Sequence, residues 1–120
     1  MITVTTTADS DGSIYKVEVA GHAEQDEYGK DIVCAAVSAL TIATINGLTE
    51  VVKADVEYLV EDGYTKFEVR DQEKTNSIKV LLDTFELAIR QMVQDHGQYV
   101  RLVKKEVQPN DQDESTAFCE

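Results

Sequence analysis

The stretch from Ile32 to Thr49 contains no charged residue, and it constrains the fold of this chain more than any other feature. Lys30 and Asp31 precede it, and Glu50 follows it directly. Its length touches the lower limit for a membrane-spanning helix, yet small and polar residues interrupt it: Ser38, Thr41, Thr44, Asn46 and Gly47. We therefore expect a helix over about Ile32–Val52 that is buried inside a small protein or at a dimer interface.

Strands are predicted on both sides of this helix. Apolar and polar residues alternate, as is typical of half-buried strands, in four segments: 2–5, 15–19, 56–60 and 65–69. The turn sequences Asp9–Gly12 and Glu61–Gly63 separate the members of each pair. The sequence therefore predicts two β-hairpins, one before the helix and one after it.

A second helix and a last strand complete the expected fold. From Thr75 an apolar stripe recurs every three or four residues until Gly97, which is well placed to end a helix. Tyr99–Val103 then indicates a strand. The predicted order is β-β-α-β-β-α-β. Strands that arrive as hairpins favour a mainly antiparallel sheet with both helices packed against it, an α+β fold.

Two segments lie outside these elements. Residues 21–30 show no periodicity and have Gly near both ends, so we expect a mobile loop. Residues 107–120 are predicted to form a disordered acidic tail, because most of them are polar and the charged ones are all acids: Asp111, Asp113, Glu114 and Glu120. The length of 120 residues fits one domain, assigned to residues 1–106.

The formal net charge of −12 limits the class of partner. Phosphate contacts need clustered Lys and Arg, so direct binding of nucleic acid is not expected, whereas a basic protein would be attracted. Met1–Thr7 lacks the pattern of a signal peptide, and two Cys are too few for a disulfide-stapled secreted fold. We expect a cytoplasmic protein with reduced thiols and no membrane partner.

His22 and Cys34 are the candidate catalytic pair, because the predicted fold brings the end of the second strand close to the start of the first helix. His96 lies at the end of the second helix and Cys119 in the tail, so neither is a candidate. His22 follows the second strand, and Cys34 lies in the first turn of the predicted helix, after a candidate N-cap at Asp31. A helix N-terminus favours a thiolate, and an imidazole could take the thiol proton and return it to a leaving amine. Alternatively, Cys34 is a small core residue and His22 a turn residue.

Asp31 and Ser38 each have two possible roles. Asp31 could cap the helix or orient the His22 imidazole. Ser38 lies one turn after Cys34 on the same helix face, so it could bond within a site or to its own helix backbone. No metal or cofactor is expected, because no C-x-x-C or H-x-x-x-H spacing occurs and His22, Asp31 and Cys34 would form an incomplete zinc site.

The residues around His22 and Cys34 also resemble a known family. Gly21-His22-Ala23, followed by Gly29-x-Asp31-Ile32-Val33-Cys34-Ala35-Ala36-Val37-Ser38-Ala39-Leu40, is similar to the ribosomal-processing cysteine proteases of Firmicutes and related bacteria. The predicted order of strands and helices extends the resemblance over about residues 1–104.

This resemblance implies a homodimeric cysteine endopeptidase with a flexible loop over its active site. Its substrate would be the precursor of large-subunit ribosomal protein L-twenty-seven, cut after a hydrophobic, Phe-containing motif. The resemblance assigns six residues: Cys34 as nucleophile, His22 as general base, Asp31 and Ser38 as supporting residues, and Gly21 and Gly29 as flexible points of the loop. Since ribosomal proteins are basic, the acidic charge would speed their encounter with the enzyme.

Two other functions are compatible with parts of this sequence. A non-catalytic regulator that binds ribosomal components would not require the intact pair of His22 and Cys34. A redox or metal-binding module would need a second thiol or more ligands in the body of the domain, and neither is evident in the sequence.

Overall fold

The fold is taken from a computed structural model that describes residues 1–21, 28–71 and 73–107, with residues 28–31 as backbone alone. Within these residues the elements follow the predicted order: β1 (Ile2–Ala8), β2 (Ile14–Ala20), α1 (Tyr28–Asn46), β3 (Val56–Glu61), β4 (Tyr64–Val69), α2 (Asn76–His96) and β5 (Val100–Glu106). A π-helical segment, η1 (Gly47–Val51), continues α1 to the predicted end of the first helix.

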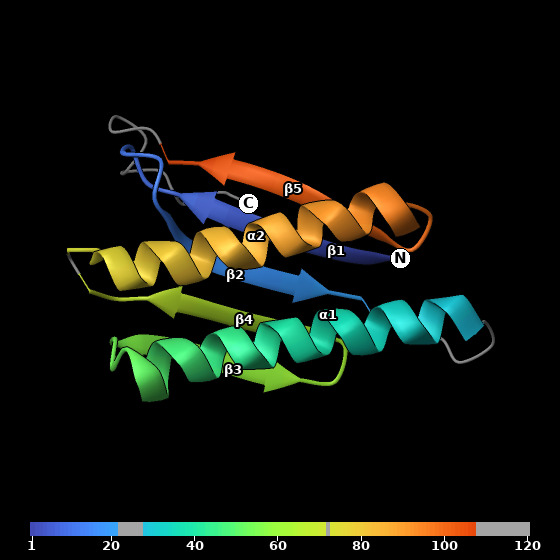
Figure 1. The fold of residues 1–120 in the computed structure, drawn as a ribbon, viewed down its shortest axis with the longest axis horizontal. Helices are drawn as coiled ribbons and strands as arrows, with labels where there is room; N and C mark the ends of the chain where they lie inside the picture. The colour runs from blue at the N-terminus through green and yellow to red at the C-terminus, as the bar shows by residue number, and fades with distance from the viewer. Residues whose placement is uncertain (22–27, 72, 108–120) are drawn as a thin grey trace.

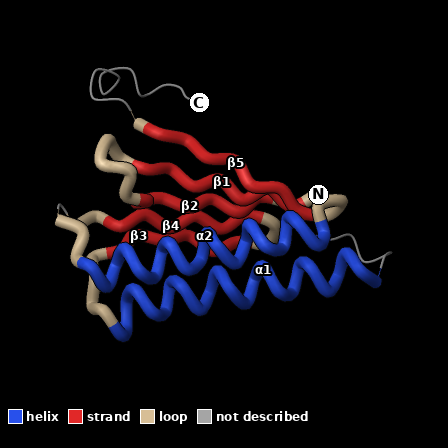
Figure 2. The backbone as a smooth tube through the Cα atoms, turned by 45° about the horizontal axis from the view of Figure 1, so that its top comes forward, coloured by secondary structure: helices blue, strands red, loops and turns tan. Residues whose placement is uncertain are grey.

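The strands form a single five-stranded sheet in the order β3-β4-β2-β1-β5. β1 pairs with β2, β2 with β4 and β4 with β3 in antiparallel fashion, while β5 lies parallel to β1. Both helices lie on the same face of this sheet, α1 nearer to β3 and α2 nearer to β1 (Figures 1 and 2). The α+β prediction and the mainly antiparallel sheet are therefore confirmed.

The core forms between the helices and the alternate strand residues that face them. Val17 and Phe67 are opposite one another in neighbouring strands and are fully buried. The Phe67 ring meets that of Phe85 in α2 edge to face, with ring centroids 6.3 Å apart, an arrangement that aromatic pairs favour. Every second residue of the strands and every third or fourth residue of α2 is apolar, and these side chains meet in one layer between the sheet and the helices.

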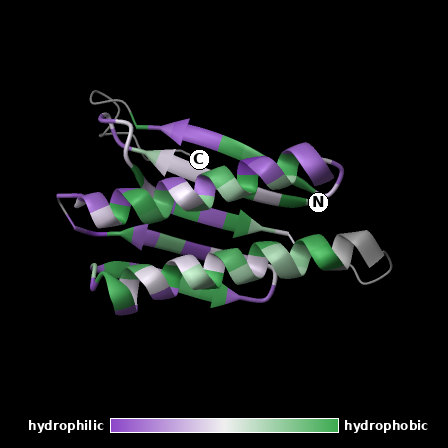
Figure 3. Ribbon diagram, in the orientation of Figure 1, coloured by the Kyte–Doolittle hydropathy of each residue, from purple (hydrophilic) through white to green (hydrophobic). Residues whose placement is uncertain are grey.

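Helix α1 uses its uncharged sequence in two ways. Val33, Val37 and Ile45 are buried, and the buried Thr41 hydroxyl donates to the Val37 carbonyl at 2.7 Å, so its polarity is satisfied within the helix. The segment Ile32–Val51 is long and apolar enough to cross a membrane by length and composition alone, yet one side of it covers the sheet. The outward side is also apolar over much of its length (Figure 3).

The predicted start of the first helix was wrong. Helix α1 begins at Tyr28 rather than Ile32, so Asp31 lies inside the helix and is not its N-cap, and Gly29 lies in its first turn. Lys and Asp are tolerated within helices, and the change from charged to uncharged sequence therefore does not mark the boundary. The predicted loop 21–30 is shortened accordingly, and its residues 22–27 lie outside the described residues.

The boundaries of the second half are closer to expectation. Thr75 caps α2 by accepting a hydrogen bond from the Ile78 N–H, and Gly97 follows as its C-cap, as predicted. Strand β5 continues beyond the predicted Val103 to Glu106. Of the predicted tail, only Val107 is described, and its N–H donates to the Ala8 carbonyl. The remaining tail residues, including Cys119, lie outside the described residues.

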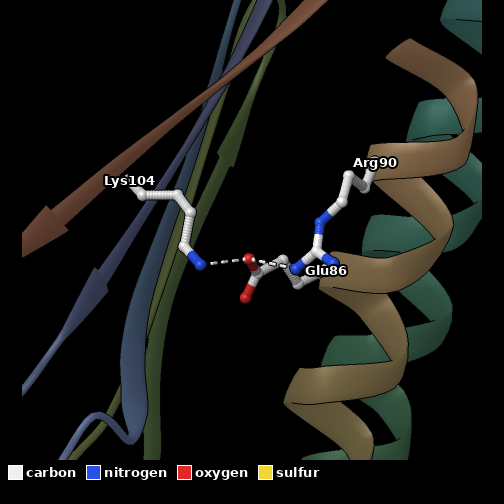
Figure 4. Close-up of polar contacts among 3 residues, drawn as sticks. All are labelled: Glu86, Arg90 and Lys104. Atoms are coloured by element: carbon white, nitrogen blue, oxygen red, sulfur yellow. Dashed lines mark hydrogen bonds and ion pairs between the residues drawn. The ribbon is translucent and has the colours of Figure 1, made fainter. Parts of the chain in front are cut away.

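A buried carboxylate ties α2 to the sheet. The Glu86 side chain is 7% exposed and receives hydrogen bonds from Arg90 at 2.9 Å and from Lys104 of β5 at 2.8 Å (Figure 4). Burial by itself raises the pKa of this carboxyl group. The bonds from Lys104 and Arg90 outweigh burial and lower the pKa below its ordinary value of 4.5.

We expect Glu86→Gln to lower the free energy of unfolding by about 1–2 kcal/mol at pH 7, because it removes the charge that both cations contact. Since the folded-state pKa is depressed, this contribution is complete above the unfolded pKa and disappears as pH falls through the folded pKa. Urea unfolding of both proteins at pH 7 and near pH 3 measures the difference. A difference that is equal at both pH values would contradict this account; Glu50→Gln is the exposed control.

Candidate active site

The candidate active site is a cavity of about 210 Å³ between α1, the end of β2 and the turn that joins β3 to β4. Cys34 and Ser38 line it from successive turns of α1, and Gly21 lines it from the end of β2. We call it the Cys34 cavity. Positions 34, 38 and 42 share one helix face, and this spacing aims their side chains at the same space.

Packing on the sheet fixes the orientation of Cys34. Val33 and Val37 are each 1% exposed and hold α1 in one rotation on the core, which leaves Cys34 partly buried at the cavity wall. The helix begins at Tyr28, well before Cys34. The helix dipole acts mainly within the first turn, and Cys34 lies beyond that turn. The expectation that the helix N-terminus activates this thiol is therefore wrong. Activation of this thiol would then depend on a base.

Gly21 marks the point where β2 leaves the sheet. Its φ of +88° lies in the left-handed region, and its N–H donates to the Gly63 carbonyl at 2.9 Å. A Cβ atom at this position would stand 2.4 Å from the Met1 carbonyl oxygen. This conformation therefore requires glycine. It directs the chain at the cavity wall immediately before His22, which lies outside the described residues.

The structure gathers three of the six residues singled out by sequence, namely Gly21, Cys34 and Ser38. The backbone of Gly29 and Asp31 lies in the first part of α1, which excludes the capping role of Asp31. The supporting role of Asp31, the hinge role of Gly29 and the base role of His22 stay predictions. Sequence reasoning did not include the opposite wall of the cavity, formed by residues 60–65. Glu61, Asp62 and Gly63 were predicted only to form a turn.

Tyr64 belongs to this wall, but its side chain and that of Glu18 lie on the sheet face away from the helices, because both alternate with the buried Val17 and Phe67. The Tyr64 hydroxyl donates to a Glu18 carboxylate oxygen at 2.9 Å. Partial burial, this hydrogen bond and the charges of Glu18 and Glu61 together raise the pKa of Tyr64 to about 12, so it is a neutral hydrogen-bond donor at pH 7. In the described part of the chain, no three His, Cys, Asp or Glu side chains come together as metal ligands would.

Comparison with known proteins identifies the family. The family model described as Cysteine protease Prp matches residues 1–101. The chain belongs to the Prp family of cysteine proteases. A ribosomal processing cysteine protease Prp from Staphylococcus aureus is 32% identical over 106 residues, which cover 85% of this chain and 97% of the relative. The Bacillus subtilis protein of the same name is 30% identical over 109 residues, covering 85% and 96%.

Solved structures agree with this Prp assignment. SMU.848 from Streptococcus mutans is 28% identical, with a TM-score of 0.81 over 89% of this chain and 99% of its own. An essential ribosomal processing protease Prp from S. aureus, in complex with a covalently linked product peptide, is 27% identical, with a TM-score of 0.78 over 88% and 100%. This chain is therefore a cysteine protease of the ribosomal-processing family, and the Cys34 cavity is its candidate catalytic centre.

Proposed function

We propose that this protein removes the N-terminal extension of large-subunit ribosomal protein L-twenty-seven by cutting after a Phe-containing hydrophobic motif. The observation that carries the proposal is the position of Cys34 in a cavity with apolar side chains around it, including Ile2, Val19 and Val37. Family membership supports a ribosomal protein precursor as substrate. The net charge of −12 supports attraction of a basic substrate.

Cys34 and His22 divide the chemistry in this proposal. The His22 imidazole takes the Cys34 thiol proton, and the Sγ attacks the carbonyl carbon of the scissile peptide bond. The tetrahedral intermediate collapses when His22 returns the proton to the leaving amine, which leaves the acyl group on sulfur. Water then hydrolyses the thioester with His22 as base and regenerates the thiol. Ser38 lines the same cavity and supports bound peptide by hydrogen bonding.

Cleavage of a defined peptide tests the proposed function. We expect the purified protein to cut a peptide spanning the extension junction of the L-twenty-seven precursor at one bond, after the Phe-containing motif, and mass spectrometry of the two fragments identifies that bond. The control peptide carries Ala in place of the Phe residues of the motif. Equal cleavage of both peptides would contradict the proposed specificity. Binding of the precursor without cleavage would favour the non-catalytic regulator instead.

The protein acts as a cytoplasmic homodimer in this proposal. Four exposed apolar side chains on α1 and β3 support the dimer: Ile32 (50% exposed), which lies beside α2, and Ile42 (40%), Tyr58 (55%) and Val60 (51%), of which Ile42 and Val60 stand at the edge of the Cys34 cavity. Tyr58 is opposite Phe67 in the sheet, so it lies on the sheet face that carries the helices. Exposed apolar side chains of this size are typical of protein interfaces.

Light scattering at micromolar concentration should give about twice the chain mass of 13.3 kDa. Ile32→Glu should shift the protein to the monomer, because the change places a charge within the interface. The control is Val80→Glu on α2, where the native side chain is equally exposed at 53%. A wild-type monomer throughout this concentration range, or a dimer that survives Ile32→Glu, would contradict the proposed interface.

A further inference from the structure

Strand β3 is an open edge of the sheet, and apolar side chains are exposed along it. The sheet order leaves β3 and β5 at the two edges, each with one neighbouring strand (Figure 2). On β5 every exposed residue is charged, which is a common way to prevent an edge from pairing with another chain. On β3, by contrast, Tyr58, Leu59 and Val60 are exposed in succession, at 55%, 44% and 51%. The β3 edge therefore lacks the protection that the β5 edge has.

These three apolar side chains lie on both faces of the sheet. Tyr58 is opposite the buried Phe67, so Tyr58 and Val60 face the side that carries the helices. Leu59 lies between them and faces the other side. The dimer contact proposed above uses the helix side and leaves Leu59 uncovered. An added strand would contact both faces, because its own side chains alternate in the same way. The pattern therefore fits a partner in extended conformation.

The backbone of β3 also has open hydrogen-bonding groups along this edge. The Arg70 N–H donates to the Asp55 carbonyl at 2.7 Å, so Asp55 and every second residue after it direct their backbone groups toward β4. The alternate residues Val56, Tyr58 and Val60 direct their N–H and C=O groups to the open side. No other described element pairs with them. They form a row of donors and acceptors at the spacing that a neighbouring strand requires.

This open edge leads to the Cys34 cavity. Val60 and Glu61, at the end of β3, line the cavity together with Cys34, whereas Val56 at the start of the strand does not. A peptide that lies along β3 and runs toward Glu61 therefore arrives at the cavity that holds the candidate nucleophile.

We propose that β3 binds the substrate as an added strand: the residues before the scissile bond pair with the open backbone of β3, and the bond itself lies in the Cys34 cavity. This inference rests on the endopeptidase function proposed above and adds the way in which the substrate is held. The proposed cleavage motif is hydrophobic and precedes the bond, which matches the apolar residues of β3. The peptide then runs in the same direction as β3, so the pairing is parallel. Backbone pairing provides affinity, and contacts of alternate side chains provide specificity.

N-methylated peptides test the pairing. Starting from the precursor junction peptide, a methyl group replaces the amide hydrogen of the third, fourth, fifth or sixth residue before the scissile bond, one at a time. Only alternate N–H groups of a strand face the neighbouring strand. We expect methylation at two alternate positions to lower kcat/KM about tenfold, and at the other two less than about twofold. The two unaffected positions are the matched control for the methyl group itself.

A backbone change in the protein gives an independent test. Tyr58→Pro removes one open N–H of β3 and suits an edge position, because this N–H does not bond to β4. The matched control Tyr58→Ala also removes the side chain but keeps the N–H. We expect kcat/KM of Tyr58→Pro to be about fivefold below that of Tyr58→Ala. Equal kcat/KM in these two variants, both folded, would contradict the pairing.

Amide hydrogen exchange measured by NMR needs no change in β3. In the Cys34→Ala protein, the Tyr58 and Val60 amides should exchange rapidly without peptide and at least about tenfold more slowly when the unmethylated peptide is bound. Exchange that the peptide leaves unchanged, or equal effects of methylation at all four positions, overturns the inference while the endopeptidase stands. Slow exchange in the free protein that becomes fast on dilution would place a second copy on this edge, and this also overturns it. Failure to cut the unmethylated junction peptide overturns the proposed function and this inference together.

Discussion

Replacing Cys34 with Ala should lower kcat/KM for peptide cleavage by about 10⁴-fold or more, because the variant has no nucleophile in the Cys34 cavity. His22→Ala should cause a loss of similar size. The double variant should be little worse than either single variant, since a nucleophile and its base act in one step and their contributions are not additive. Initial rates on the precursor junction peptide provide the measurement.

The fold should survive the Cys34 substitution. Cys34 is only partly buried, and its neighbours Ala35 and Ala36 already place the Ala side chain in this helix. Far-UV circular dichroism and the thermal midpoint check this for each variant. Ser38→Ala serves as the comparison within the same cavity, with an expected loss of about tenfold or less, because it removes one hydrogen-bonding group and no reacting atom. Substantial cleavage by folded Cys34→Ala protein would exclude Cys34 as the nucleophile.

The order and type of the elements followed from the sequence because local periodicity and tertiary burial agree in this protein. Val17 and Phe67 occupy alternating positions in predicted strands and both face the helices. The stripe through Phe85 and Ile89 of α2 covers the same layer. When the apolar period of each segment matches the face it buries, the pattern alone predicts strand, turn and helix.

The start of α1 could not be predicted from the same signals. Lys30 and Asp31 suggested a boundary, and an Asp before an apolar run is a common N-cap. The helix nevertheless extends back to Tyr28. Both residues are compatible with helical backbone, so the sequence held no signal that separates a cap from an ordinary position in the first turns.

Only the α1 wall of the Cys34 cavity could be predicted from the sequence. The spacing of Cys34 and Ser38 identified the helix face, because positions one turn apart lie together in any helix. The wall that carries Glu61, Asp62 and Tyr64 reaches Cys34 through the pairing of β2 with β4, between residues more than forty positions apart in sequence. Such a contact depends on the strand order β3-β4-β2-β1-β5, which no local pattern specifies.

Gly21→Ala should lower the free energy of unfolding by about 3 kcal/mol and reduce peptide turnover more than the loss of folded protein explains. A left-handed φ costs a non-glycine residue about 1–2 kcal/mol, and overpacking adds about 1–3 kcal/mol. The added Cβ would stand 2.4 Å from the Met1 carbonyl oxygen. Met1 cannot withdraw freely, because the adjacent Ile2 N–H is bonded to the Tyr99 carbonyl at 2.8 Å.

Gly12→Ala is the matched control for this prediction. Gly12 has a similar φ of +84°, compared with +88° for Gly21, but nothing lies within 4 Å of its Cβ position. It should therefore lose only the backbone term, about 1–2 kcal/mol, and keep its turnover per folded molecule. Urea unfolding and kcat/KM for both variants separate the two contributions. Equal destabilisation of Gly12→Ala and Gly21→Ala would mean that the chain around Met1 yields. Unchanged turnover in Gly21→Ala would mean that this turn does not position the residues that follow it for catalysis.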